Sequence, residues 1–327
     1  MLRRRAQLVS VSLATLKVLA APRFRRIALT LGVVTLNGVF EIHSARSEND
    51  CAEIGRSYQL IKTQADSIQI NTTLFAATRS GCDNLVHELL DAHASLLARD
   101  RTGAMPLAVA AGEGRRSLVE LFLARGAPID ARDLDGSTAL FAAAAHEKTS
   151  TARLLLAQGA DPNLSGRSGI TPIIAAAFAG NDRIVEELLT RGADPNARDA
   201  TGKGAITYAA ARGFDDVVRR LLDAGVDARA RYGNELTALM WAAGHDEGVG
   251  ASAVARVIDL LQAHGAALDD ADNRGRTALM IAAGLGDADA VDLLLHRGAD
   301  RSRKDKESKT ALDLAANDAV RTKLAAP

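Results

Sequence analysis

The chain has 327 residues, of which 47% are hydrophobic and 24% are charged, a composition typical of folded proteins. Lys plus Arg and Asp plus Glu each number 40, so the formal net charge is zero and the composition gives no indication of nucleic-acid binding. The charge is unevenly spread. Residues 1–45 contain seven of the basic residues and one of the acidic residues, so the 33 basic and 39 acidic residues left in 46–327 give that part a net charge of −6.

Residues 1–45 have the pattern of an export signal. An apolar run of 14 residues, 27–40, follows Arg25 and Arg26, and the small residues Ser44 and Ala45 come after it. The run fits the ~7–15 apolar residues of a signal peptide and is shorter than the ~20 that cross a bilayer. We therefore expect cleavage after Ala45, a periplasmic or secreted mature protein, and no stable membrane span once the signal is removed.

The length of this leader leaves other interpretations open, because 45 residues exceed the usual ~15–30. Translation could begin downstream of Met1, which would make the protein cytoplasmic. The stretch without acidic residues before Glu41 could also be an organelle transit peptide. Finally, residues 27–42 could be retained as a membrane anchor, although Asn37 and Glu41 are unfavourable in one.

The next segment, residues 46–71, is predicted to form an N-terminal capping helix, because Ile54, Tyr58 and Ile61 recur at helical spacing. Cys51 lies in this segment, and the second cysteine, Cys82, lies further along the chain. In an oxidising compartment the two could form a disulfide that ties this segment to the body of the protein. The alternative is two free thiols, and two cysteines alone do not decide between them.

From residue 72 to the C-terminus, a pattern recurs every 33 residues. A dipeptide precedes each Leu/Ile-x-x-Ala-Ala run, and its first residue occurs at intervals of 33, then 40, then 33, at Thr138, Thr171, Gly204, Thr237, Thr277 and Thr310. Met105 and Thr72 continue the series backward. The seven extra residues of the sixth unit fall near 244–250, and we place them in the turn between its two helices.

Each unit is predicted to be a helix, a tight turn, an antiparallel helix and a projecting turn. The threonine can cap the first helix by accepting a backbone N–H, and Pro172 suits the first helical turn. Gly180 lies where that helix should end, because glycine adopts the left-handed exit conformation easily. An amphipathic run such as 184–189 then forms the second helix. One unit alone cannot bury enough apolar surface, so the units must stack.

This pattern resembles the ankyrin repeat. The family's 33-residue unit opens with Thr-Pro-Leu-His-x-Ala-Ala and closes with Gly-Ala-Asp-x-Asn; the best copy here is Thr171-Pro172-Ile173, Ala176-Ala177 and 192–196. The family's histidine is replaced throughout, by Phe141, Ile174, Thr207, Met240 and Met280. The resemblance covers 72–327 and implies an all-α ankyrin-repeat solenoid with projecting β-turn hairpins, about seven repeats and a short C-terminal cap.

Catalytic and metal-binding motifs are not evident. The seven histidines are scattered, and no cysteine pair has zinc-ligand spacing. His245-Asp246-Glu247 is the one local cluster of ligand types, but three adjacent residues cannot converge on one metal without other ligands. We therefore expect no enzyme activity, no cofactor and no metal. The alternatives are an intracellular adaptor, an enzyme-inhibiting or regulatory subunit, and an active site near His245.

The resemblance implies that a protein partner docks on the concave face formed by the projecting turns and first helices. The side chains there that suit an interface are Arg167, Phe178, Lys203, Arg212, Tyr232, His245, Arg274 and Arg276. We expect Tyr232 to be an exposed aromatic of an unusual hairpin, 231–235. Tyr208 and Trp241 are expected in the core, because other units have Ala142 or Ala175 at their position. We expect a monomer, and the sequence does not identify the partner.

Overall fold

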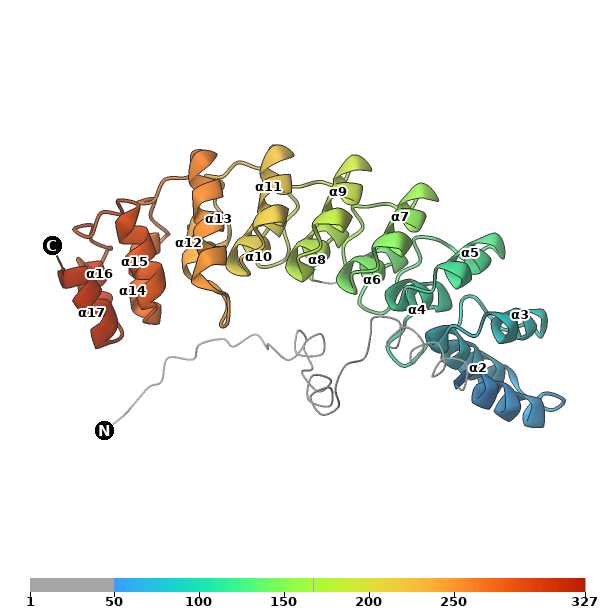
Figure 1. Cartoon of the computed structure of the whole chain (residues 1–327). Helices are drawn as coiled ribbons and strands as arrows, with labels where there is room; N and C mark the ends of the chain where they lie inside the picture. Colours follow the sequence, from blue (N-terminus) through green and yellow to red (C-terminus); the bar gives the residue numbers. More distant parts are fainter. Residues whose placement is uncertain (1–49, 167, 327) are drawn as a thin grey trace, which may run out of the picture. The chain divides into compact units, whose positions relative to one another are not determined.

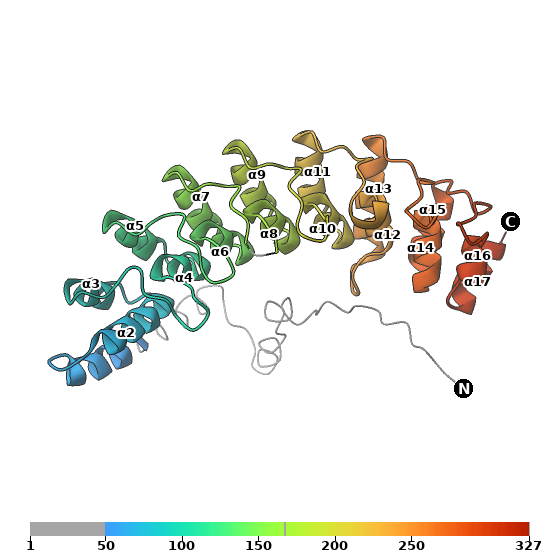
Figure 2. The same ribbon diagram turned by 180° about the vertical axis from the view of Figure 1, so that it is seen from behind.

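The structure is a computed structural model, which describes residues 50–166 and 168–326 (Figure 1). The expected export signal at 1–45 and the candidate residue Arg167 lie outside the described residues. Within them the chain forms a row of antiparallel helix pairs, and Figure 2 shows the same row from behind. No strand forms in these ranges; an isolated bridge joins Arg198 to Gly204. The predicted all-α solenoid of helix–turn–helix units is confirmed.

The first helix of each pair lies on one side of the row and the second helix on the other. The first helices are α2 (Ser67–Ser80), α4 (Pro106–Glu113), α6 (Ala139–Ala145), α8 (Pro172–Ala179), α10 (Ala205–Ala211), α12 (Ala238–Ala243), α14 (Ala278–Leu285) and α16 (Ala311–Leu314). The second helices are α3 (Asp83–Asp91), α5 (Arg116–Ala124), α7 (Thr149–Ala157), α9 (Asp182–Thr190), α11 (Asp215–Asp223), α13 (Ala251–Ala263), α15 (Ala288–His296) and α17 (Asp318–Ala325). Neighbouring first helices pack more closely than neighbouring second helices, so residues 50–326 curve toward the first helices.

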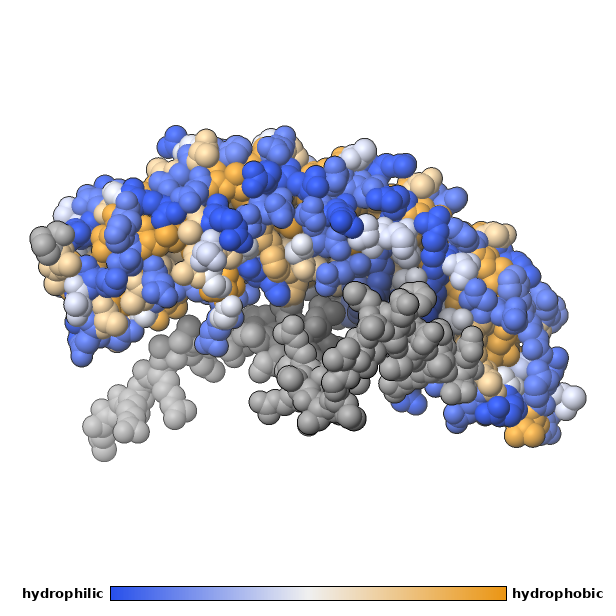
Figure 3. Space-filling view, viewed as in Figure 1, coloured by the Kyte–Doolittle hydropathy of each residue, from blue (hydrophilic) through white to orange (hydrophobic). Residues whose placement is uncertain are grey.

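Small side chains allow this close packing. The alanine pairs of the first helices are almost completely buried: Ala110-Ala111, Ala143-Ala144, Ala176-Ala177, Ala242-Ala243 and Ala282-Ala283. Leucine, isoleucine and valine of the second helices complete one continuous core along the row. The view in Figure 3 shows a largely hydrophilic surface broken by small apolar patches, as expected for a row whose apolar residues face its interior.

The helix ends follow the predicted signals. The side chains of Thr138, Thr237, Thr277 and Thr310 each accept the N–H of the third helical residue, at 3.2–3.4 Å. Thr171 is different, because its buried hydroxyl has no hydrogen-bond partner among the residues that the structure describes. Four first helices end at a glycine in the left-handed conformation: Gly81, Gly114, Gly180 and Gly286.

The first unit differs from the others. Helix α2 begins at Ser67, so the boundary expected at residue 72 lies inside a helix. Asp66 and Gln69 form a reciprocal capping box that starts the helix early. The Thr72 hydroxyl does not cap a helix but donates to the carbonyl oxygen of Ile68, at 2.7 Å.

Residues 50–61 are helical and pack against the first unit. Tyr58 is 2% exposed, and Ile54 and Ile61 are half-buried against the same core. A disulfide joins Cys51 of this helix to Cys82, which precedes α3, with their Cα atoms 5.3 Å apart. The helix that covers the first unit is thus held by both burial and a covalent bond.

A second departure is the sixth unit. Only part of the seven-residue insertion lies in the turn between α12 and α13. The rest lengthens α13, which has 13 residues where the other second helices before the last unit have nine. The insertion therefore builds an extra helical turn as well as a longer loop.

Candidate partner-binding surface

The projecting turns share one construction. Their first residue is an aspartate in five units: Asp100, Asp133, Asp199, Asp272 and Asp305. In each case one carboxylate oxygen accepts the backbone N–H groups two and four residues later; for Asp199 these are Thr201 and Lys203, at 2.8 and 3.1 Å. Burial alone would raise the pKa of Asp199, but its hydrogen bonds outweigh burial and lower it. The charged carboxylate thus fixes the turn and orients the residue that precedes the first helix.

In the turn between α11 and α12, Tyr232 takes the place of this aspartate. Its backbone N–H donates to the carbonyl of Leu236, four residues later, just as the N–H of Asp199 donates to the carbonyl of Lys203. The prediction that Tyr232 is exposed is wrong, because the side chain is only 6% exposed. Its ring packs against Gly204, and the Arg198 guanidinium lies 4.7 Å from the ring centroid. Burial raises the pKa of Tyr232 to about 12. The η1 turn (Gly233–Glu235) that follows is the exposed part of this hairpin.

A continuous series of rings and cations lies along α8, α10 and α12. We call it the aromatic–cation row; its members are Phe214, Arg212, Phe178, Tyr208, Lys203 and Trp241. All six are half-buried. Tyr208 and Trp241, expected in the core, pack against it with one side and contribute to this row with the other.

At one end of the row, Arg212 lies over two rings. Its guanidinium carbon is 4.3 Å from the centroid of Phe178 and 5.4 Å from that of Phe214. Phe214 in turn covers Gly180, where a Cβ atom would approach the ring within 2.7 Å. A glycine at this position therefore permits the ring to lie flat over the end of α8, as well as allowing the left-handed backbone that ends the helix.

At the other end, Lys203 lies between two rings. Its ammonium is 4.6 Å from the centroid of Trp241 and 5.5 Å from that of Tyr208. Tyr208 also meets Phe178 edge to face, at 5.8 Å, which joins the two halves of the row. The Tyr208 hydroxyl donates to Asp199 at 2.5 Å, so the ring is held by the turn that also positions Lys203. The pKa of Tyr208 is raised, mainly because the side chain is buried and also because its hydroxyl donates to a carboxylate.

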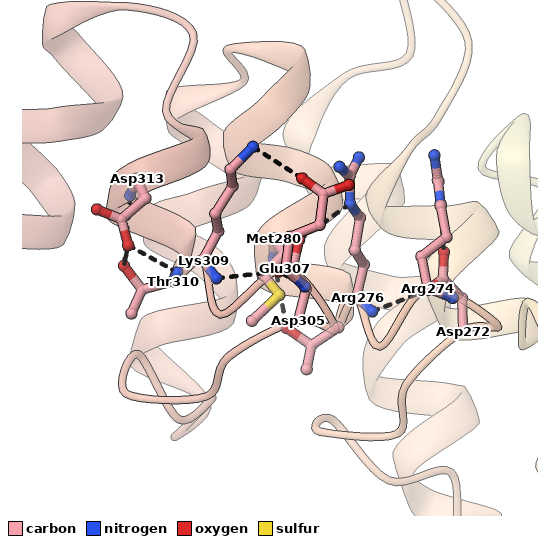
Figure 4. A network of polar contacts seen from close by, with 10 residues as sticks. Asp272, Arg274, Arg276, Met280, Asp305, Glu307, Lys309, Thr310 and Asp313 are labelled. Atoms are coloured by element: carbon pink, nitrogen blue, oxygen red, sulfur yellow. Dashed lines mark hydrogen bonds and ion pairs between the residues drawn. The ribbon is translucent and has the colours of Figure 1, made fainter.

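Arg274 and Arg276 are placed differently from Lys203 and Arg212. Figure 4 shows them in a polar network with the last two projecting turns. Arg274 pairs with Asp272 of its own turn at 3.3 Å, and Arg276 with Asp305 of the next turn at 3.5 Å. Both arginines therefore have carboxylate partners within the protein, and they support the turns.

His245 also has an internal partner. Its Nε2 lies 2.8 Å from an Asp287 carboxylate oxygen, and its side chain is 14% exposed. Its neighbours Asp246 and Glu247 are exposed and do not converge with it. In the parts of the chain that the structure describes, no group of three or more His, Cys, Asp or Glu side chains could hold a metal ion. The cluster singled out in the sequence is thus a structural tie between units.

Sequence reasoning selected Phe178, Lys203 and Arg212 but missed Phe214 as part of the same surface. A signal for it existed. The position before the second helix is Arg115, Lys148 and Asn181 in the three preceding units, so an aromatic residue there is unusual. The contacts of Tyr208 and Trp241 with Lys203 had no such signal.

The chain matches known repeat families over most of its length. A family profile described as ankyrin repeats (3 copies) matches residues 73–166, 107–199 and 173–251, and one described as ankyrin repeats (many copies) matches 260–315. The solved ankyrin repeat domain of human ASB11 is similar, with 26% identity and a TM-score of 0.60, over 68% of this chain and 96% of that one. No curated protein matches the sequence.

The described residues contain no helix that is both long and apolar enough to pass through a membrane. The helix pairs, the 33-residue register and the profile matches agree with one another. The chain therefore belongs to the ankyrin repeat family.

Proposed function

We propose that this protein is a non-enzymatic scaffold that binds another protein on the concave surface formed by its first helices and projecting turns. Its ankyrin repeats support a role in protein–protein interaction. The observation that carries the choice of surface is the aromatic–cation row, which places half-buried aromatic rings on three adjacent first helices and an arginine at the end of one of them. Aromatic residues and arginine contribute most to binding energy at protein interfaces.

The test is partner capture with charge-reversal variants. Arg212→Glu places a negative charge in the row, whereas Arg183→Glu places one on the exposed face of the second helix α9. We expect the wild type and Arg183→Glu to capture the same partner from extracts of the native compartment, and Arg212→Glu to lose it. Equal capture by all three proteins would show that the partner binds elsewhere.

We also propose that the mature protein acts as a monomer in an exported, oxidising compartment. The disulfide between Cys51 and Cys82 supports the oxidising compartment, because such bonds persist in secreted and periplasmic proteins. The leader pattern of residues 1–45 supports it independently. N-terminal sequencing of the protein from its own cells should begin near residue 46, and alkylation should find no free thiol. An intact leader together with two reactive thiols would indicate an intracellular protein.

A further inference from the structure

We propose that the aromatic–cation row binds an acidic, extended segment of the partner protein, with one carboxylate at Lys203 and another at Arg212. This inference rests on the proposed function, because it assumes that the concave surface is where a protein docks. It goes further in stating the chemistry of the segment that is bound.

The two cations keep their hydrogen-bonding groups available. The Arg212 guanidinium lies near the Phe178 and Phe214 rings. Neither ring has an oxygen that could accept a hydrogen bond from it. Guanidinium N–H groups point outward in the plane of the group, so stacking leaves its edges free for a bidentate carboxylate. Lys203 likewise contacts Tyr208 and Trp241 through its ammonium without a carboxylate acceptor.

Neither cation has a carboxylate partner among the described residues, where ion pairs within 4.0 Å involve other side chains. Asp199 lies in the same turn as Lys203, and its two oxygens already accept from Tyr208, Thr201 and backbone N–H groups. Arg274 and Arg276 of a neighbouring projecting turn are instead paired with Asp272 and Asp305. The row is thus a place where positive charge is held in position and left uncompensated.

The surrounding charge favours a short acidic segment over a nucleic acid. Residues 46–327 carry a net charge of −6, so the field of this part of the chain repels a long polyanion. Binding to nucleic acid draws its affinity from many phosphate contacts, which two isolated cations do not supply. A peptide with a few carboxylates can satisfy both cations without meeting that repulsion.

The geometry also suits an extended chain. Phe178 and Tyr208 lie between the two cations and contact each other edge to face at 5.8 Å. An extended segment advances about 3.3 Å per residue, so its two carboxylates must be a few residues apart, with the intervening side chains over these rings. The stacked cations are already ordered, which reduces the entropy lost when the segment binds.

The protein contains one tryptophan, Trp241, and it lies 4.6 Å from the Lys203 ammonium. Its fluorescence therefore reports directly on this site. We would titrate the full chain with a ten-residue peptide of alternating Glu and Ala, and with the same peptide carrying Gln in place of Glu. Calorimetry on the same samples measures binding independently of fluorescence.

We expect saturable binding of the Glu peptide that weakens as salt is added, and at least tenfold weaker binding of the Gln peptide. Lys203→Gln and Arg212→Gln should each weaken binding of the Glu peptide by about tenfold, the loss of one charged hydrogen-bond pair. Arg183→Gln, on the second helix α9, should leave it unchanged. Circular dichroism of each variant confirms that the helices are intact.

Equal binding of the Glu and Gln peptides, or equal weakening by Arg183→Gln, would overturn the proposal. Tighter binding of a single-stranded oligonucleotide than of the Glu peptide would replace it with a nucleic-acid site. If the Glu peptide does not bind but Arg212→Glu still abolishes partner capture, only the acidic chemistry is wrong. If capture is also unaffected by Arg212→Glu, the proposed function itself fails.

Discussion

At the scale of single residues, Tyr232 shows how a position within the repeat decides burial. Its register is that of Asp199 and Asp272, both of which are buried in their turns. The N-cap of the neighbouring helix α10 is Gly204, where five other units have threonine. A Cβ at this glycine would lie 2.9 Å from the tyrosine ring. The large ring of Tyr232 thus fits at the aspartate position because its neighbour, Gly204, has no side chain.

Tyr232→Ala should therefore act on stability. Removing a buried aromatic side chain typically lowers the free energy of unfolding by about 3 kcal/mol, and urea denaturation would measure this change. The matched control is Arg198→Ala, which removes the exposed cation over the same ring and should cost less than about 1 kcal/mol. A Tyr232→Ala variant as stable as the wild type would contradict the burial of this ring.

The turn aspartates predict a dependence of stability on pH. The pKa of Asp199 is lower in the folded protein than its ordinary value, so the folded state binds the proton less tightly than the unfolded state does. The stabilisation is complete above the unfolded pKa of about 3.9, and it is lost as the pH falls through the lower folded pKa.

Asp199→Asn should lower the free energy of unfolding by about 1–2 kcal/mol at pH 6, because the charged acceptor is lost. The difference from the wild type should shrink as the pH is lowered toward 3. Urea midpoints at several pH values test this. Asp223→Asn, at an exposed position of α11, is the control and should follow the wild type at every pH. A difference for Asp199→Asn that grows on acidification would show that the sign is wrong.

At the scale of elements, the insertion of the sixth unit connects three units. The Asp246 N–H donates to the Ala211 carbonyl of α10 at 2.9 Å, which reaches the preceding unit. His245 reaches the following unit through Asp287, which also caps α15 by accepting two backbone N–H groups. Val249 of the same loop lies over Gly213. The insertion therefore reinforces the stack at a point where the 33-residue spacing is broken.

His245→Ala should lower the free energy of unfolding by about 1–2 kcal/mol, because it leaves the mostly buried Asp287 carboxylate without this partner. Hydrogen exchange should become faster in α15, the helix that Asp287 caps. Glu247→Ala changes an exposed residue of the same loop and should alter neither measurement. If both variants behave alike, the loop does not tie the units together.

At the scale of the described domain, stability depends on contacts between neighbouring units and on how the two ends are covered. The C-terminal end closes with α16 and α17, of which α16 has only four residues. The N-terminal end is covered by residues 50–61, attached through the disulfide between positions 31 residues apart. In the chain-entropy description, closing a loop of this length stabilises the folded state by about 4 kcal/mol.

Reduction of the disulfide should therefore weaken the first units selectively. We expect helix loss, followed by circular dichroism, to begin at lower urea concentration in the reduced protein. The Trp241 fluorescence transition, which reports on the sixth unit, should move much less. A Cys51→Ala/Cys82→Ala variant should behave like the reduced protein and be insensitive to reductant. Coincident shifts of both signals would instead indicate that the row unfolds as one cooperative unit.

Much of the fold and only part of the candidate site could be predicted from the sequence. Threonine caps, the glycine after α8 and the amphipathic runs are local signals. Because they recur every 33 residues, the prediction for each unit supports the prediction for the others. Within the site, residue type and register selected Phe178, Lys203 and Arg212. Register could also have indicated the burial of Tyr232, whose equivalents in other turns are aspartates.

The sequence by itself therefore determined the repeated all-α architecture and the family of this protein, because those depend on interactions between residues close together in the chain. Only the tertiary structure decided which cations are neutralised. Arg276 pairs with Asp305 and His245 with Asp287. Lys203 lies over Trp241 of the next unit, and Arg212 lies over Phe178 of the preceding unit. These contacts join residues about 30–40 positions apart, and they depend on how closely and at what angle adjacent units pack.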